Sequence, residues 1–427
     1  MKKLCKYAIT IMLALIARLV VHRYKPTIVM VTGSVGKTST KDAVAAVLSS
    51  RFFVRKSEKS FNSEFGVPFT ILGVGNPWDN PFEWLIVIKS ALALLILPNH
   101  YPNMLVLETG ADKPGDLAWI LRFATPNAVV VTRLPEIPVH VEAYSSPEAV
   151  REEEFSPALA LPVDAPLIVP SDDQYALDRA MCTQARLISY GTTDDATVRI
   201  SDVGFYENDG TVVGMQANVS LKDKQKKLLI EGSVGKTQIF PAAAALATAF
   251  AFNIPITEAI KSLKDYKPPC GRGCLLKGKN GSYIIDDSYN ASPAAVEEAL
   301  STLKSFPLHS IGGRRIAVLG DMLELGRYSV IEHERISAIA GDSADIIVTV
   351  GIRARAFATS PKNAEVLSFD NSYIAASALR ELVREGDVVL VKGSQSIRTE
   401  RITEALLANP SDASNLVRQE KKWKQKV

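Results

Sequence analysis

Residues 27–40 read TIVMVTGSVGKTST, and they combine a short apolar run with a glycine-rich turn and a helical pattern. The β-branched run 27–32 predicts a buried strand, and the pattern of 38–48 predicts a helix. Glycines at such a junction let backbone N–H groups curl around phosphate oxygens, and the start of the helix adds positive potential. The sequence therefore predicts a phosphate-binding loop made of Gly33, Ser34, Val35, Gly36, Lys37, Thr38 and Ser39.

The last residues of this loop decide its chemistry. Lys37 is expected to reach the β- and γ-phosphates of ATP, and Thr38 is expected to supply a hydroxyl to Mg²⁺. The spacing between the two glycines is shorter than in the usual P-loop. The same six residues recur at 232–237, but the helix there begins only after Pro241, so we expect no phosphate site in the second copy.

Strands and helices alternate along most of the chain, which predicts an α/β protein with parallel sheets. Expected elements of the first half are strands 104–108 and 128–132 and helices 115–123 and 242–252. Between 194 and 229 the pattern changes to short alternating strands, with a hairpin turn at Asn208-Asp209-Gly210. Beyond a linker at Lys267-Pro268-Pro269, a second doubly wound domain is expected, with strands at 283–286, 315–319, 346–350 and 388–391.

A chain of 427 residues is too long for one ordinary domain. The predicted segments are an apolar N-terminal helix (1–25), a central ATP-binding domain (26–267) with an apolar helical insertion (82–98), a C-terminal Rossmann-like domain (268–410) and a basic tail (411–427). The stretch 421–426 of this tail is expected to be a solvated end, and contact with anionic lipid is the alternative.

Two apolar stretches, 7–21 and 82–97, leave their role open. Each carries few charges and is short for a membrane span, so both could lie in the membrane interface with their lysines and arginines near the headgroups. The alternative is a pair of buried helices that pack on each other. On the first interpretation the protein contacts the inner face of the cell membrane through the N-terminal helix.

Composition excludes few functions. The formal charge of +3 is small, and we expect no nucleic-acid partner. The four cysteines are scattered and are expected to be reduced thiols of a cytoplasmic protein. A monomer is expected.

Several ordered motifs between residues 27 and 405 resemble the Mur ligase family. The loop TGSVGKTST, the segment FNSEFGVP at 61–68 and Glu108-Thr109-Gly110-Ala111 are similar to its ATPase domain. The segments DDSYNA at 286–291, GDMLELG at 320–326 and KGSQS at 392–396 are similar to the branch that adds D-alanyl-D-alanine. The resemblance implies a P-loop central domain and a ligase reaction in which ATP converts a carboxylate to an acyl phosphate that an amine then attacks.

The resemblance also implies roles for single residues. Thr38, Glu108 and His140 match positions that hold Mg²⁺, and Lys37, His140 and Arg272 match catalytic positions. Arg272 is also expected to reach the ATP phosphates. Further nucleotide-facing positions are Asp286, Asp287, Tyr289 and Asn290. Substrate-facing positions are Asn62, Lys392 and Ser394.

Three departures from the family pattern are visible. The loop begins at residue 33, which leaves room for one apolar helix in place of a UDP-sugar-binding domain. Glu154 stands where the family has a carbamylated lysine, so its carboxylate is a candidate metal ligand; the alternative is that it lies on a solvated helix face. Gly235-Lys236-Thr237-Gln238 replaces the family's adenine-contacting Gly-Arg-His-Asn.

The function expected from the sequence is therefore an ATP- and Mg²⁺-dependent amide ligase that adds D-Ala-D-Ala to a peptidoglycan precursor. Its partners would be a small cell-wall precursor and an amino acid or dipeptide. Two alternatives stay open. One is a related ligase with another acceptor, and the other is a catalytically impaired nucleotide-binding scaffold at the membrane.

Overall fold

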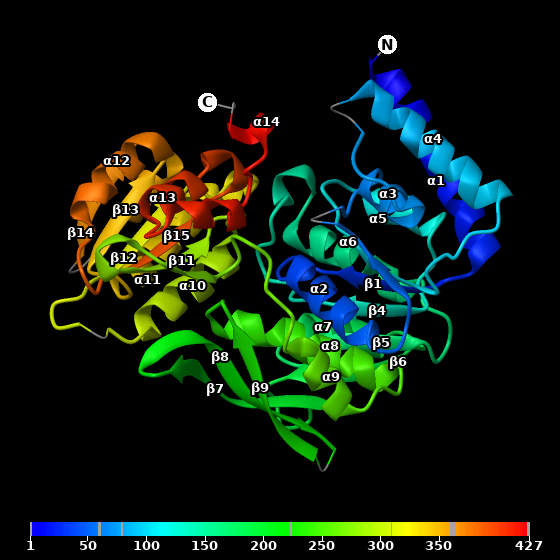
Figure 1. The fold of residues 1–427 in the computed structure, drawn as a ribbon, viewed down its shortest axis with the longest axis horizontal. Helices are drawn as coiled ribbons and strands as arrows, with labels where there is room; N and C mark the ends of the chain where they lie inside the picture. The colour runs from blue at the N-terminus through cyan, green and yellow to red at the C-terminus, as the bar shows by residue number, and fades with distance from the viewer. Residues whose placement is uncertain are drawn as a thin grey trace.

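Two β-sheets organise the chain in the computed structural model, which describes residues 2–58, 61–77, 80–222, 224–308, 310–358 and 364–424. The first sheet has nine strands in the order β2-β3-β1-β4-β5-β6-β7-β8-β9, and the second has six in the order β10-β11-β15-β12-β13-β14. Figure 1 shows the sheets in two lobes, with β7, β8 and β9 reaching below the second. The expected α/β class is confirmed.

The first sheet is parallel from β2 to β7 and antiparallel from β7 to β9. Its strands are β1 (Thr27–Thr32), β2 (Val54–Lys56), β3 (Met104–Glu108), β4 (Ala128–Val131), β5 (Pro166–Pro170), β6 (Arg186–Gly191), β7 (Val198–Asn208), β8 (Thr211–Leu221) and β9 (Lys224–Glu231). The expected strand 27–32 and the hairpin turn at 208–210 are confirmed.

Helices cover both faces of this sheet because side chains alternate along each strand. On β1, Val29 and Val31 point into the core beneath α2 (Lys37–Leu48), α8 (Ile239–Ala251) and α9 (Ile256–Leu263). Ile28 and Met30 point into the opposite core. That second core is covered by α1 (Lys2–Tyr24), α3 (Gly66–Leu72), α4 (Pro81–Ile96), α5 (Asp116–Leu121), α6 (Pro147–Leu159) and α7 (Gln174–Met181).

The second sheet is parallel except at its edge strand β10. Its strands are β10 (Cys274–Lys277), β11 (Tyr283–Asp287), β12 (Arg315–Gly320), β13 (Ile346–Val350), β14 (Glu365–Phe369) and β15 (Val388–Lys392). Its helices are α10 (Pro293–Ser305), α11 (Ser329–Gly341), α12 (Ser372–Leu382), α13 (Glu400–Leu406) and α14 (Lys421–Lys424). The four strands expected here are present, whereas β10 and β14 were not predicted.

The two lobes share one continuous core. Phe205 of β7 and Phe306 at the end of α10 meet edge to face, with ring centroids 5.3 Å apart. Arg133, just after β4, also bonds Glu298 of α10 at 2.9 Å. The antiparallel strands therefore support the second lobe against the first, although the predicted boundary at 267 stays a prediction.

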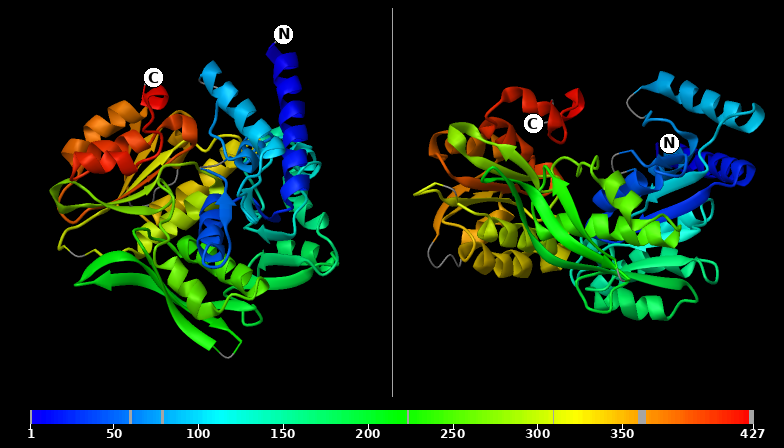
Figure 2. Two further views of the ribbon diagram at one scale, coloured as in Figure 1. Left: turned by 45° about the vertical axis from the view of Figure 1, so that its right-hand side comes forward. Right: turned by 60° about the horizontal axis from the view of Figure 1, so that its bottom comes forward.

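The apolar helices α1 and α4 lie at the outer edge of the first lobe, which Figure 2 shows from two further directions. They pack on each other, as the alternative interpretation expected, but each buries only one side and exposes the other. In the described part of the chain, Lys6–Tyr24 is long and apolar enough to cross a bilayer, a property that core helices and signal sequences share.

The C-terminal segment folds back onto the second lobe. Leu416 and Arg418 are buried, and Arg418 donates to the carbonyls of Ser288 and Tyr289. Farther along, Lys421 and Lys424 are exposed, which agrees with the solvated end expected at 421–426. Cys182, Cys270 and Cys274 are free thiols, as expected; the side chain of Cys5 lies outside the described residues.

Candidate functional site

A cavity of about 810 Å³ lies between the two lobes. The central lobe lines it with the loop residues 34–39, Asn62, Glu108 and His140. The second lobe lines it with Arg272, Asp287, Tyr289, Asn290, Lys392 and Ser394. Most residues predicted from distant motifs thus meet at one place. Gly33, Glu154 and Asp286 do not line the cavity and lie behind its wall.

Contacts within the protein hold the first part of the loop backbone. Gly33 has φ 113°, and a Cβ there would lie 2.4 Å from Oγ1 of Thr132, so only glycine fits. Gly33 N donates to Glu154 Oε2 at 3.2 Å, and the next two amides donate to the Arg133 carbonyl. The first half of the loop is therefore engaged with protein. The donors left for a phosphate are the N–H groups at the start of α2. No carbonyl within the helix is placed to accept a hydrogen bond from them.

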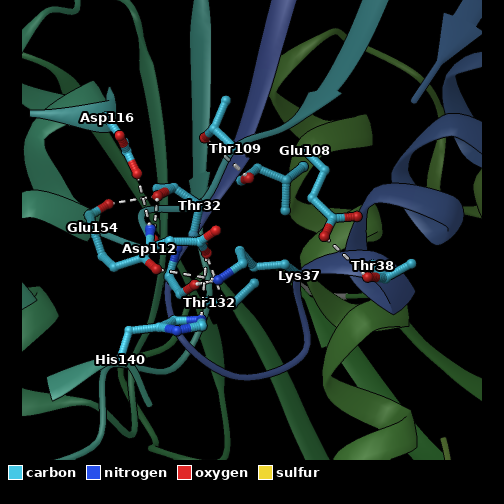
Figure 3. Close-up of polar contacts among 12 residues, drawn as sticks. Thr32, Lys37, Thr38, Glu108, Thr109, Asp112, Asp116, Thr132, His140 and Glu154 are labelled. Carbon is cyan, nitrogen blue, oxygen red and sulfur yellow. Dashed lines mark hydrogen bonds and ion pairs between the residues drawn. The ribbon is translucent and has the colours of Figure 1, made fainter. Parts of the chain in front are cut away.

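Lys37 is held by a buried carboxylate. Its Nζ donates to the Gly33 carbonyl and lies 3.2 Å from Glu154 Oε1. Only 2% of Glu154 is exposed, and its Oε2 also accepts a hydrogen bond from Thr32 Oγ1 at 3.2 Å. The interpretation of Glu154 as part of a solvated helix face is therefore wrong. Figure 3 shows Glu154 and His140 on one side of the Lys37 side chain, with Thr38 and Glu108 on the other.

Thr38, Glu108 and Arg272 form a polar group across the domain boundary. Thr38 Oγ1 donates to Glu108 Oε1 at 3.1 Å and accepts a hydrogen bond from an Arg272 amino group at 3.0 Å. The Arg272 guanidinium also stacks on the Tyr289 ring at 4.1 Å. An arginine of the second lobe thus touches the phosphate loop of the first.

The Glu108 carboxylate is buried among cationic side chains. Burial raises the pKa of this carboxyl, against the lowering effect of Lys41, Arg272 and Lys37. Its Oε2 makes no hydrogen bond with any residue that the structure describes, and Lys41 Nζ is 3.8 Å away. A buried carboxylate oxygen beside a hydroxyl is the hard oxygen set that Mg²⁺ prefers, so these residues fit that ion.

His140 joins the two lobes on the other side of Lys37. Its Nδ1 lies 3.1 Å from Glu324 Oε2, and its Nε2 lies 3.6 Å from Asp112 Oδ1. Burial opposes the charged form of His140, but the bond to Glu324 and the charges of Glu324 and Asp112 outweigh it and raise the pKa. The same bond lowers the pKa of Glu324.

In the second lobe, Asp286 and Asp287 at the end of β11 have different surroundings. Asp286 is buried and accepts from Thr403 Oγ1 at 3.0 Å, and burial raises its pKa to about 6. Asp287 Oδ2 lies 2.5 Å from Lys392 Nζ, which also donates to the Asn290 carbonyl at 3.1 Å. Lys392 therefore organises the 287–290 turn, while Ser394 Oγ accepts from Leu323 N at 2.9 Å.

Some residues of the site were missed by sequence reasoning. Lys41 of α2 was not predicted as a site residue. It is buried, burial lowers its pKa, and it donates to the Ser57 carbonyl at 2.8 Å. Glu324 lies within the motif at 320–326, but no role was predicted for this residue. Trp423 lines the cavity beside Arg398, and no local pattern in the tail pointed to it.

The second copy of the loop sequence, at 232–237, also borders the cavity. Val234, Thr237 and Gln238 contribute to its wall, whereas the Lys236 side chain is exposed. The amide oxygen of Gln238 is buried without a hydrogen-bond partner among the described residues. The end of this copy lies in a 3₁₀ turn, Lys236–Gln238. It therefore does not join a strand to an α-helix in the way that the first copy does.

The described residues contain no group of three or more His, Cys, Asp and Glu side chains gathered as a metal cage. Of the four predicted metal ligands, Thr38 and Glu108 are in contact on one side of Lys37. His140 and Glu154 lie on the other side (Figure 3), where His140 contacts Glu324 and Glu154 contacts Lys37. Their metal-binding role stays a prediction.

Comparisons with known proteins agree with this geometry. Residues 31–249 match the family of the Mur ligase middle domain, and residues 271–395 match the Mur ligase glutamate ligase domain. The chain is 29% identical to the UDP-N-acetylmuramoyl-tripeptide–D-alanyl-D-alanine ligase of Bacillus subtilis, covering 90% of this chain and 76% of that protein. It is 26% identical to the corresponding Escherichia coli ligase, covering 90% of this chain and 77% of that one.

Among solved structures, the chain is similar to the MurF ligase from Thermotoga maritima in complex with ADP. The TM-score is 0.75 at 25% identity, over 93% of this chain and 83% of that one.

Proposed function

The chain belongs to the Mur ligase family of ATP-dependent ligases, and from this membership we propose that it joins D-alanyl-D-alanine to a UDP-muramoyl tripeptide. The observation that carries the proposal is the cavity itself. A phosphate loop on one lobe faces motifs similar to those of the D-Ala-D-Ala-adding relatives on the other.

In the proposed reaction, the carboxylate of the acceptor peptide attacks the γ-phosphorus of ATP, and the bond to the ADP oxygen breaks. Lys37 and the first N–H groups of α2 would hold the triphosphate, because they combine a mobile positive charge with fixed donors. Arg272 would contact the same phosphates from the second lobe. Binding in one cleft aligns the reacting atoms and removes an entropic cost.

Thr38 and Glu108 are the residues proposed to hold a first Mg²⁺, and His140 and Glu154 are proposed for a second. Such an ion supplies neutralisation of the charge on the transferring phosphoryl group. Glu154 currently contacts Lys37, so its proposed role requires Lys37 to turn toward the nucleotide.

The second half of the reaction is attack of the amine on the acyl phosphate, with release of inorganic phosphate. Lys392, Ser394 and Asn62 are proposed to face these substrates from the cavity wall. Closure of the two lobes around the substrates would exclude water and so protect the acyl phosphate from hydrolysis. Asp286, Asp287, Tyr289 and Asn290 would shape the nucleotide side of this wall.

Phosphate release tests the function directly. We expect release only when ATP, a UDP-MurNAc-tripeptide and D-Ala-D-Ala are all present, with a new amide product detected by mass spectrometry. ATP turnover without either substrate, or no turnover at all, would favour the nucleotide-binding scaffold. Turnover with a different amine or acceptor would favour the related ligase.

Substitution of Arg272 tests the contact between the lobes. Arg272→Lys keeps the charge but loses the planar fork and the stacking on Tyr289, so we expect kcat to fall by roughly tenfold or more with little change in Tm. The measurement is steady-state phosphate release together with thermal unfolding.

Arg401→Lys is the matched control. Arg401 stacks on Tyr373 at 3.9 Å in the same lobe but does not line the cavity. Equal kcat values for the two variants would show that the Arg272 contact has no part in turnover.

The proposed location is the cytoplasmic side of the cell membrane, where ATP is present. The proposed partners are the small-molecule substrates, and the proposed state is a monomer.

A further inference from the structure

The helices α1 and α4 form a two-sided pair at the outer edge of the central lobe. Each turns one stripe of small and aliphatic side chains toward the protein core. These buried residues are Leu13, Ala17 and Val20 on α1 and Val87, Ala91 and Leu94 on α4. The pair is fastened at its C-terminal ends, where Tyr24 donates to the Leu94 carbonyl at 2.8 Å and Arg23 donates to that of Leu95.

The opposite sides of both helices expose large apolar side chains. We call these residues the α1/α4 apolar face: Tyr7, Met12, Leu15 and Leu19 on α1, and Phe82, Leu85, Ile86, Ile88, Leu92, Ile96 and Leu97 on or next to α4. Leu85 is 63% exposed and Ile96 68%. Scattered apolar residues are normal on a soluble surface, but a contiguous group on two adjoining helices marks an interaction site.

The charges around this face have one dominant sign. Lys6, Arg18, Arg23 and Lys89 are exposed on the two helices. The described part of α1 contains no acidic residue, and α4 contains only the half-buried Glu83. Glu64, on the neighbouring segment, is paired with Lys6 at 3.5 Å. An apolar face surrounded by exposed lysines and arginines is complementary to a bilayer that carries anionic headgroups.

We propose that the α1/α4 apolar face docks the protein on the surface of an anionic lipid bilayer. The helices lie in the interface plane and do not cross the membrane, because Leu13, Ala17 and Val20 already pack against the central lobe. Spanning would require α1 to leave this core.

Docking would also orient the cavity. Lys6 lies over the Phe65 ring at 5.0 Å, and Asn62, a few residues earlier, lines the cavity. The docked protein therefore keeps this side of the cavity close to the headgroups. The docking inference does not depend on the proposed ligase reaction.

Vesicle co-sedimentation of the full chain tests the inference. We expect strong binding to vesicles that contain phosphatidylglycerol and weak binding to pure phosphatidylcholine. The triple variant Leu15→Ser/Leu85→Ser/Leu92→Ser should weaken binding to the vesicles by roughly a hundredfold. It lacks three exposed leucine side chains that would otherwise transfer from water into the bilayer. Arg18→Glu/Lys89→Glu should weaken binding to the anionic vesicles by at least about fivefold per charge and leave binding to phosphatidylcholine unchanged.

The matched control is Val330→Ser/Ile331→Ser/Ile352→Ser, which removes exposed apolar residues of the second lobe. It should bind vesicles like the unmodified chain, and all variants should keep the same Tm. Wild-type protein that stays in the supernatant, or equal loss in the face and control variants, would overturn the proposal. The proposal would also be overturned if light scattering showed a dimer of the unmodified chain and monomers of the triple leucine-to-serine variant. The α1/α4 apolar face would then bind a second copy of the chain and not a bilayer.

Discussion

Lys37→Ala is expected to weaken ATP binding by at least roughly a hundredfold, because it removes the only charged side chain of the loop residues 33–39. Loss of one partner from a buried, charge-assisted contact costs about 2–5 kcal/mol. Isothermal titration calorimetry with a non-hydrolysable ATP analogue measures the affinity without turnover. Phosphate release should fall in parallel.

The chain provides its own control for this substitution. Lys236 occupies the same position in the second GSVGKT string, but its side chain is exposed and does not line the cavity. Lys236→Ala should therefore bind the analogue like the unmodified protein. Because Lys37→Ala leaves Glu154 buried without its cation, thermal unfolding must show that the variant is folded. Unchanged affinity in a folded Lys37→Ala protein would refute the assignment of the loop.

Glu154→Gln is expected to lower kcat by roughly a hundredfold while keeping the size of the side chain. The amide oxygen can still accept from Gly33 N, but the negative charge facing Lys37 is lost. If Glu154 holds a cation during turnover, the Mg²⁺ concentration needed for half-maximal activity rises in the variant. If Glu154 only positions Lys37, the affinity for ATP changes and the Mg²⁺ dependence does not.

Glu152→Gln is the matched control, since Glu152 lies on the same helix and is exposed. It should leave kcat, ATP affinity and Mg²⁺ dependence as they are. Both variants are measured over a Mg²⁺ titration at saturating ATP. A Glu154→Gln enzyme with unaltered kinetics would remove Glu154 from the site altogether.

The sequence predicted the parts of the fold whose patterns are local. The run 27–32 is buried on both faces, so its β-branched residues identified β1 from residue 27 to residue 32. The turn at 208–210 was equally clear, since Asp209 and Gly210 adopt positive φ. Strands β5 and β6 were missed because Pro166 and Pro170 bound the first and an exposed Arg186 begins the second, which weakens the apolar signal.

Site residues that belong to a recognisable motif could be predicted from the sequence. The contacts between residues of different motifs could not be predicted. Nothing near residue 154 in the sequence indicates that its carboxylate meets Lys37, because the contact arises from the packing of α6 behind β1. Arg418 likewise belongs to a segment rich in charge, and only the fold shows that its guanidinium holds the turn at 288–289. Such contacts depend on how distant elements pack together, and they produce no periodic pattern in the local sequence.

The contact between Arg272 and Thr38 has a consequence for the pace of turnover. One residue belongs to each lobe, and the group between them is where the spent nucleotide would be held. Release of ADP would require that contact to open, so separation of the two lobes would be one step of each turnover.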